Sequence, residues 1–178
     1  MQSPVPHFIH SLTALSKILD KAAAHAEAKK IKPEVLPQAR LIADMFPLLR
    51  QICIATDHAK GAPARLAGVD VPSFADTETT IAELQERIAK TIAFLKSIPD
   101  SAYEGAEART ITVKAGPREL TFPALQYLHS YAVPNFYFHM TTTYNILRAN
   151  GVDLGNLHII KKKNTIGDCA SVLHARAK

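Results

Sequence analysis

The stretch FIHSLTALSKILDKAAAHA, residues 8–26, sets the class of the fold because its apolar side chains recur every three or four residues. This alternation places the side chains on one face of an α-helix. The apolar stripe consists of Phe8, Leu12, Leu15, Leu19, Ala22 and Ala26. We expect an amphipathic helix over about residues 4–29, which must bury this face against other helices.

A second apolar stripe continues the same period from Leu41 and Met45 to Ala59. Pro47 interrupts it, and a proline removes one helical hydrogen bond and clashes with the preceding turn. Either this helix is kinked at Pro47, or a short helix ends and a longer one starts near Asp44. The residues expected to close the segment are Gly61, Pro63 and Gly68.

The third helical stripe runs from Ile81 to Leu95. Asp76 or Thr77 is the expected N-cap, because a short side-chain oxygen can accept from the first free backbone N–H groups. The spacing of Glu83 and Arg87 predicts a stabilising ion pair between side chains one turn apart. Pro99 is expected to stop the helix.

A different pattern follows, since residues 109–114 and 118–122 alternate apolar and polar side chains on either side of an Ala-Gly-Pro turn. This pattern predicts a β-hairpin, which is stable only when packed on a larger body. A fourth helical region follows from Pro123 to about Gly151, and Pro134 divides it into 124–132 and 134–150. The predicted fold is an all-α four-helix bundle with a small β-hairpin between helices three and four.

Charge and composition narrow the function classes. Residues 161–178 hold five basic residues and one acidic residue, so this tail carries nearly all of the chain's net charge of +5. We expect a single domain over residues 1–160 and a basic C-terminal tail over residues 161–178. Nucleic-acid binding needs an extended cationic surface, so we rank it last and expect no nucleic-acid partner.

Two cysteines, Cys53 and Cys169, exclude a disulfide framework and a cysteine-based zinc knuckle. No apolar run approaches the roughly 20 residues of a membrane span, and no signal peptide is expected. We therefore expect a cytoplasmic protein without a membrane partner. The thiol of Cys53 is interpreted as buried and inert.

Histidines are the main candidates for chemistry, and His58 and His139 fall within the two helices that prolines interrupt. Zinc sites need three or four converging ligands, often two of them one helical turn apart. The residues four positions from His139 are Asn135 and Thr143, and neither is a good zinc ligand. From the residues alone, a structural histidine is favoured over a tight metal ligand.

Tyrosine and threonine hydroxyls gather in sequence around His139. Their spacing fits core packing, but a core built only for stability would avoid so many polar groups that need partners. A ligand pocket is the other interpretation. The candidate pocket residues are Tyr131, Tyr137, Thr143 and Tyr144.

The segments LIADMFPLLRQICIATDHAKGAPARLAG (41–68) and VPNFYFHMTTTYNILRANGVDLG (133–155) resemble a domain-of-unknown-function branch of the DinB/YfiT-like superfamily of metalloenzymes. The resemblance implies a bundle that often forms a homodimer, with a pocket at one end. Metal-binding members hold zinc or nickel with one histidine on the second helix and an HxxxH pair on the fourth. By this likeness His58 and His139 are the metal ligands, while the second histidine of the pair is replaced by Thr143.

Two function hypotheses follow, and the sequence leaves open whether the protein is an enzyme. The first is a metal-dependent enzyme that acts on a small molecule by thiol transfer or hydrolysis, because a bound divalent ion lowers the pKa of a thiol or water. The second is a non-catalytic, dimeric small-molecule-binding module that needs no metal. The threonine at position 143 favours the second hypothesis.

Overall fold

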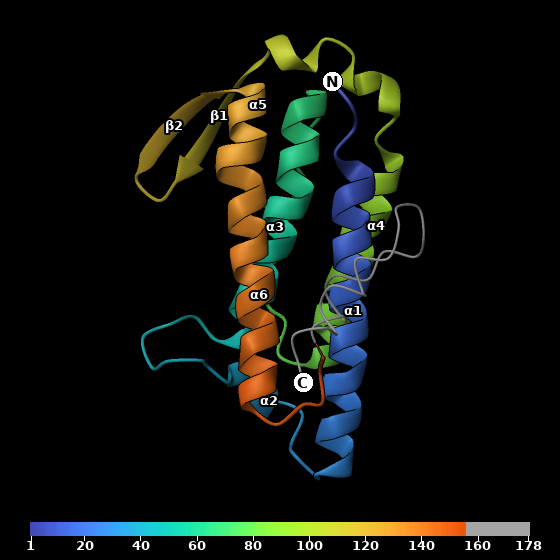
Figure 1. The fold of residues 1–178 in the computed structure, drawn as a ribbon, viewed down its shortest axis with the longest axis vertical. Helices are drawn as coiled ribbons and strands as arrows, with labels where there is room; N and C mark the ends of the chain where they lie inside the picture. Colours follow the sequence, from blue (N-terminus) through green and yellow to red (C-terminus); the bar gives the residue numbers. More distant parts are fainter. Residues whose placement is uncertain (156–178) are drawn as a thin grey trace, which may run out of the picture.

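The computed structural model describes residues 1–155, and these residues form four long helices with a small hairpin between the third and the fourth (Figure 1). The long helices are α1 (Val5–Ala28), α3 (Leu48–Ala67), α4 (Ile81–Ser97) and α6 (Val133–Ala149). The expectation of a mostly helical bundle with one hairpin is confirmed. The predicted basic tail, residues 161–178, lies outside the described residues.

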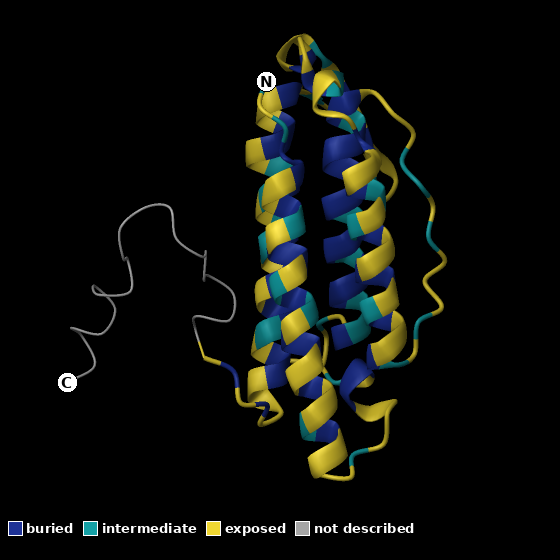
Figure 2. Cartoon of the chain, turned by 90° about the vertical axis from the view of Figure 1, so that its right-hand side faces the viewer, coloured by how far each residue is buried: buried dark blue, intermediate teal, exposed yellow. Residues whose placement is uncertain are grey.

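Each long helix has a buried side that faces the interior of the bundle and an exposed side opposite to it (Figure 2). The buried side chains are mostly apolar. In the bundle α3 lies beside α6 and α4, and α1 lies beside α4. The apolar stripe predicted for α1 is buried from Phe8 to Ala26. None of the helices in residues 1–155 is long and apolar enough to cross a membrane.

At Pro47 the structure follows the second of the two predicted alternatives. A short helix, α2 (Val35–Gln38), ends before Pro47, and α3 begins directly after it. The predicted apolar stripe is wrong at its start, because residues 39–47 are not helical and Leu41 is 39% exposed. A proline is favoured at a helix start, where its missing N–H would have no partner in any case.

The predicted end of this helix is confirmed at Gly68 and wrong at Gly61 and Pro63. The helix α3 runs through Gly61 and Pro63 to Ala67, and Gly68 ends it with a left-handed backbone at φ 73°. Residues 59–64 are all buried, so tertiary packing of these small side chains outweighs the helix-breaking tendency of glycine and proline. Glycine suits the cap because it adopts a positive φ without strain.

The N-cap of α4 is Thr80, so the predicted caps at Asp76 and Thr77 are wrong. Thr80 accepts from the backbone N–H of Glu83, and the Glu83 carboxylate accepts from the backbone N–H groups of Thr79 and Thr80, at 2.6 and 2.9 Å. Glu83 therefore does not pair with Arg87 as its spacing predicted. Its carboxylate closes a capping box, while Arg87 points into the bundle.

After α4, two 3₁₀ turns (Asp100–Tyr103 and Ala106–Ala108) lead into the hairpin of β1 (Thr110–Ala115) and β2 (Arg118–Pro123). The strands are antiparallel, with Ile111 opposite Phe122 and Val113 opposite Leu120. Ile111 and Val113 are buried, so the hairpin lies on the helical body as expected.

The last helical region is continuous, although Pro134 was predicted to divide it. It begins with α5 (Ala124–Gln126), widens into a π-helical segment (Tyr127–Ala132) and continues as α6. Pro134 occupies the first turn of α6. The predicted division therefore takes the form of a change in helix type, and the wider turn sets which side chains face α3.

Candidate functional site

The two candidate histidines meet inside the bundle, one from α3 and the other from α6. The ring centroids of His58 and His139 lie 6.2 Å apart, and the ring planes are within 15° of parallel. His139 is buried and His58 is half-buried. The solvent-accessible part of the pair is therefore mainly the His58 ring. Two imidazoles far apart in sequence are thus held at short range.

A glutamine fixes the orientation of His139. The Nδ1 atom of His139 lies 2.7 Å from Oε1 of Gln51, and Nε2 of the same glutamine donates to the carbonyl of Phe46 at 3.0 Å. Because the Phe46 carbonyl can only accept, the glutamine turns its oxygen toward the histidine, whose Nδ1 must carry the proton. The lone pair of His139 is therefore on Nε2.

Both imidazoles favour the neutral form. The pKa of His58 is lowered to about 4, mainly by burial and also by the nearby His139 and Arg65, against the opposing effect of Asp57. Burial also lowers the pKa of His139, with a smaller effect from the positive charge of Arg50. A neutral imidazole is the form that ligates metals and accepts protons, so both side chains are ready for either role at pH 7.

Aromatic side chains cover one side of the pair. Tyr131 contacts His58 edge to face, with ring centroids 5.7 Å apart, and it stacks on Tyr127 at 5.9 Å. Phe122, from strand β2, packs against both tyrosines. We call these three residues, Phe122, Tyr127 and Tyr131, the aromatic wall. The hairpin and the π-helical segment together place this wall beside His58.

The other predicted pocket residues have different surroundings. The Tyr137 hydroxyl lies 3.1 Å from Oγ of Ser11 and 3.2 Å from Nε2 of His7, both on α1. The Tyr144 hydroxyl donates to the carbonyl of Leu154 at 3.4 Å. Of the tyrosines predicted for the pocket, Tyr131 is the one that the structure brings into ring contact with His58.

Thr143 is fully buried one helical turn after His139. Its hydroxyl donates to the carbonyl of His139 at 2.9 Å, which is a bond within α6. A threonine bonded in this way offers no strong metal ligand. Position 143 therefore lacks the second histidine of an HxxxH pair and supplies no metal ligand in its place.

A second cluster lies below α4, where ligand atoms of Cys53, Asp76 and Glu78 are all within 4.8 Å of one another. Among residues 1–155 this is the one group of three histidine, cysteine or acidic side chains with that compactness. The cluster is compatible with a metal ion by distance. However, burial raises the pKa of Cys53 to about 12, so its thiol is protonated, and metals bind the thiolate.

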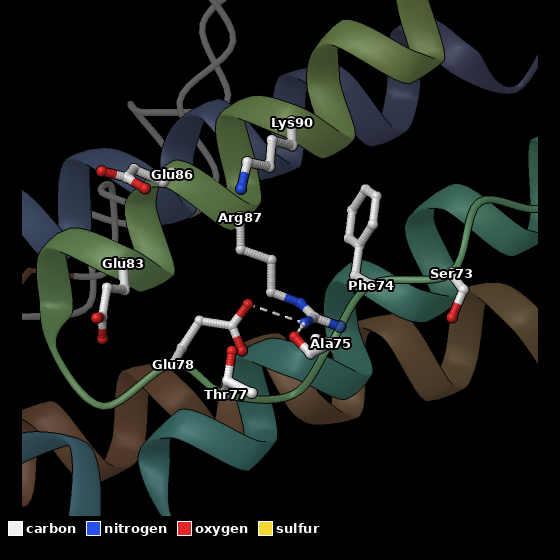
Figure 3. Close-up of a pocket in the computed structure, with 9 residues that line it drawn as sticks. All are labelled: Ser73, Phe74, Ala75, Thr77, Glu78, Glu83, Glu86, Arg87 and Lys90. Atoms are coloured by element: carbon white, nitrogen blue, oxygen red, sulfur yellow. Dashed lines mark hydrogen bonds and ion pairs between the residues drawn. The ribbon is translucent and has the colours of Figure 1, made fainter.

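The buried guanidinium of Arg87 lies next to this cluster. The side chain reaches from α4 to the segment of residues 73–78 (Figure 3). It contacts three carboxylates at 2.9–3.1 Å, donates to a threonine hydroxyl at 2.7 Å and donates to a backbone carbonyl at 3.2 Å. These partners are Asp57, Asp76, Glu78, Thr56 and Ala75. The carboxylates thus already have a cation, and a cavity of about 340 Å³ opens beside them.

The histidine pair can be tested for its fit to a metal ion. With metal–nitrogen bonds of about 2.0–2.1 Å, two imidazoles that share one ion have ring centroids no more than about 6.5 Å apart. The observed separation of 6.2 Å lies within this limit. The centroid distance therefore permits a shared ion with two protein ligands, and the compact group of three in residues 1–155 includes neither histidine.

Sequence reasoning missed Gln51, Arg65 and Arg87 as parts of the site. Arg87 had a usable signal, because it follows Leu84 by three residues and precedes Thr91 by four, on the buried face of α4. Gln51 likewise lies next to Ile52 at a buried position of α3. A polar residue on an apolar stripe needs a buried partner, and that need is visible in the sequence although the partner is not.

Comparisons with known proteins identify the family of this chain. The family model described as a domain of unknown function, DUF1993, matches residues 1–160. A crystal structure of a DinB family member protein from Shewanella denitrificans is 38% identical, covers 92% of this chain and 93% of that chain, and superposes with a TM-score of 0.84. No curated protein matches the chain. The chain therefore belongs to the DUF1993 family and is a DinB-like protein.

Proposed function

We propose that His58 and His139 bind a divalent transition-metal ion, zinc or nickel, and that the protein is a metal-dependent enzyme acting on a small molecule. The observation that carries this proposal is the pairing of two near-parallel imidazoles, from α3 and α6, with centroids 6.2 Å apart. Thiol transfer or hydrolysis is the reaction type proposed. A bound ion supplies the chemistry for either, because it lowers the pKa of a coordinated thiol or water.

The surroundings of the pair support this role. Metal-ligating histidines commonly donate their second ring N–H to a fixed acceptor, and Gln51 is such an acceptor for Nδ1 of His139. Burial keeps both imidazoles neutral, which is the form that ligates. Two protein ligands leave the remaining coordination positions to water or substrate, as catalytic sites require.

The chain's own residues would orient a small molecule beside the pair. The aromatic wall gives an apolar face next to His58, with Tyr131 in direct ring contact. Gln51 holds the His139 ring at one angle through its bonds to Nδ1 and to the Phe46 carbonyl. The half-buried edge of His58 is where such a molecule would approach.

A metal-free binding module is the second candidate function, and Thr143 favours it. Its hydroxyl is bonded to the backbone, so α6 offers one imidazole where metal-binding relatives are expected to offer two. In this candidate the neutral histidines and Tyr131 bind a small molecule by hydrogen bonds and stacking. The two candidates differ in a measurable quantity, which is the metal content of the purified protein.

Metal content by mass spectrometry tests the proposal. The purified, untagged protein is compared with the His58→Ala/His139→Ala variant and with a matched control, His10→Ala/His129→Ala, which removes two exposed histidines. We expect close to one equivalent of zinc or nickel in the wild type and the control, and loss of metal in the site variant. Substoichiometric metal in all three proteins would remove the metalloenzyme and leave the binding module.

A cytoplasmic location stays a prediction from the cysteine content. We also propose that the protein forms a homodimer. An apolar groove of about 450 Å³ lies between residues 41–45 and α6, with Leu41 and Phe138 largely exposed at its rim. A second copy of the chain would remove this apolar surface from water. Light scattering of Leu41→Glu should report a monomer while the control Val69→Glu stays dimeric, and a monomeric wild type would refute the dimer.

A further inference from the structure

The side chain of Arg65 folds back along α3 toward His58. Seven residues, close to two helical turns, separate the two positions, so they share one face of the helix. Helical side chains point toward the N-terminus of their helix, which directs Arg65 over Gly61. A Cβ built on Gly61 would overlap Nη1 of Arg65 and lie 3.4 Å from its Cζ. The guanidinium therefore fills the volume that a side chain at position 61 would occupy.

A tyrosine of the aromatic wall anchors this guanidinium. Nη1 of Arg65 donates to the Tyr127 hydroxyl at 3.1 Å. The other buried or half-buried guanidiniums differ from it: Arg87 has three carboxylates, Arg50 pairs with Asp76, and Arg109 donates to the carbonyls of Leu66 and Ala102. Within residues 1–155 no carboxylate lies within 4.0 Å of Arg65, so its charge is positioned but not neutralised.

The acidic residue nearest in sequence to His58 already has two cationic partners. Asp57 precedes His58, but its carboxylate accepts from both Arg87 and Lys60. Two rings lie beside His58, which are the imidazole of His139 and the aromatic ring of Tyr131. The half-buried surface between Arg65 and His58 thus combines a fixed cation, a neutral hydrogen-bonding group and an aromatic face.

We propose that Arg65, held over Gly61 by Tyr127, is an anion-binding subsite beside His58, and that the ligand of this site is a small molecule with a carboxylate group. Guanidinium binds carboxylate and phosphate with the same donor fork, and the adjoining aromatic wall favours a carboxylate on a planar apolar body. This inference deepens the proposed function and rests on it for the location of the site. It does not require a metal.

Gly61→Ala is the most informative variant, because Arg65 supplies the three heavy atoms nearest to the new Cβ. Alanine favours a helix more than glycine does, so the fold should be retained. The Arg65 guanidinium would have to move away from the new Cβ, which changes its position relative to the Tyr127 hydroxyl. Arg65→Gln removes the charge itself, and Arg118→Gln removes an exposed arginine of the hairpin as the matched control.

Binding is measured by nuclear magnetic resonance titration of chelator-treated protein with benzoate, its neutral analogue benzamide, and inorganic phosphate. We expect benzoate to shift the resonances of His58 and Tyr131 and benzamide to bind at least tenfold more weakly. We expect Gly61→Ala and Arg65→Gln each to weaken benzoate binding at least tenfold, and Arg118→Gln to leave it unchanged. Thermal melts of all variants verify that the fold is intact.

Three results would overturn the inference: benzoate binding that is equal in the wild type and Arg65→Gln, benzamide binding as tightly as benzoate, or no benzoate binding by the wild type. Phosphate binding without benzoate binding would overturn the carboxylate assignment. The metal content of Arg65→Gln separates this inference from the proposed function, since Arg65 is not a ligand. A wild type that is free of metal as purified, before chelator treatment, and that binds benzoate through Arg65 would refute the metalloenzyme and support the subsite.

Discussion

Oε1 of Gln51 lies 2.7 Å from Nδ1 of His139, and this bond joins α3 to α6 in the interior of the bundle. Both side chains are buried, so water does not replace either partner if the other is removed. The same bond settles the tautomer of the histidine. A single glutamine thus contributes to the stability of the bundle and fixes the tautomer and orientation of His139 in the candidate site.

Replacing Gln51 with methionine should weaken metal binding and the fold together. We expect zinc affinity to fall roughly 10–100-fold, as for lost acceptors behind ligating histidines. The free energy of unfolding should fall by about 1–3 kcal/mol, because Nδ1–H of His139 is left buried without an acceptor. A zinc competition assay and urea unfolding measure the two effects. The exposed Gln38→Met is the control, and unchanged zinc affinity in Gln51→Met would contradict the assigned role.

Arg87 should be among the most sensitive positions for stability. Arg87→Met removes the cation of Glu78 and one of the two cations that pair with Asp57 and with Asp76, and we expect a loss of about 3 kcal/mol in the free energy of unfolding. This is the lower end of the range for buried pairs, because Asp57 and Asp76 are 41% and 38% exposed at the side chain. Urea unfolding measures the loss.

Arg87→Lys should recover only part of that stability, because an ammonium cannot reproduce the planar fork that serves these acceptors. The matched control is Lys90→Met, which removes an exposed cation one turn along α4 and should change stability by less than about 0.5 kcal/mol. Equal unfolding curves for Arg87→Met and Lys90→Met would contradict the importance given to the buried guanidinium.

The carboxyl group of Glu83 should make the free energy of unfolding depend on pH. Backbone N–H groups of Thr79 and Thr80 lower the pKa of the Glu83 carboxyl to about 2 in the folded state. Since the folded pKa is the lower one, the stabilisation is fully present above about pH 4.5 and is lost as the pH falls toward 2. The stability difference between wild type and Glu83→Gln should therefore be present at pH 6 and vanish near pH 2.

Denaturant unfolding across that pH range measures the difference. Glu86→Gln is the control, since it removes an exposed carboxylate three residues along the same helix. A difference between wild type and Glu83→Gln that stays constant from pH 6 to pH 2 would show that the capping carboxylate does not titrate as expected.

Thr143→His should add an imidazole one turn after His139, on the same side of α6. We expect zinc affinity to rise at least tenfold, measured by chelator competition. Because Thr143 is fully buried, overpacking should lower the free energy of unfolding by about 1–3 kcal/mol. Thr141→His, at an exposed position, is the control, and equal zinc affinity in the two variants would show that the pair does not face position 143.

Periodicity predicted those helices whose apolar face is regular. The stripe from Phe8 to Ala26 and the stripe from Ile81 to Leu95 both correspond to observed helices, since hydrophobic burial determines them. Periodicity failed where tertiary packing overrides the local helix propensity of the residues. The segment around Gly61 and Pro63 stays helical because it is buried, and its partners are far away in the chain, such as the Tyr103 hydroxyl that donates to the Pro63 carbonyl.

The candidate site was only partly predictable for a related reason. The resemblance to a family pointed to His58 and His139, but periodicity within one helix cannot measure the distance between two helices. Tyr137 illustrates the limit, since its hydroxyl bonds to α1 although its neighbours in sequence flank His139. A shift of one residue changes the direction of a helical side chain by about 100°.

The π-helical segment Tyr127–Ala132 holds one more residue per turn than an α-helix would. In genetic terms such a turn is equivalent to a single inserted codon that the helix absorbs without breaking. Deleting one codon there would leave His139 in place and rotate Tyr127 by about 100° around the helix axis, away from Arg65. A one-residue deletion in this segment would therefore change the surroundings of the proposed anion subsite, while the histidine pair remained as it is.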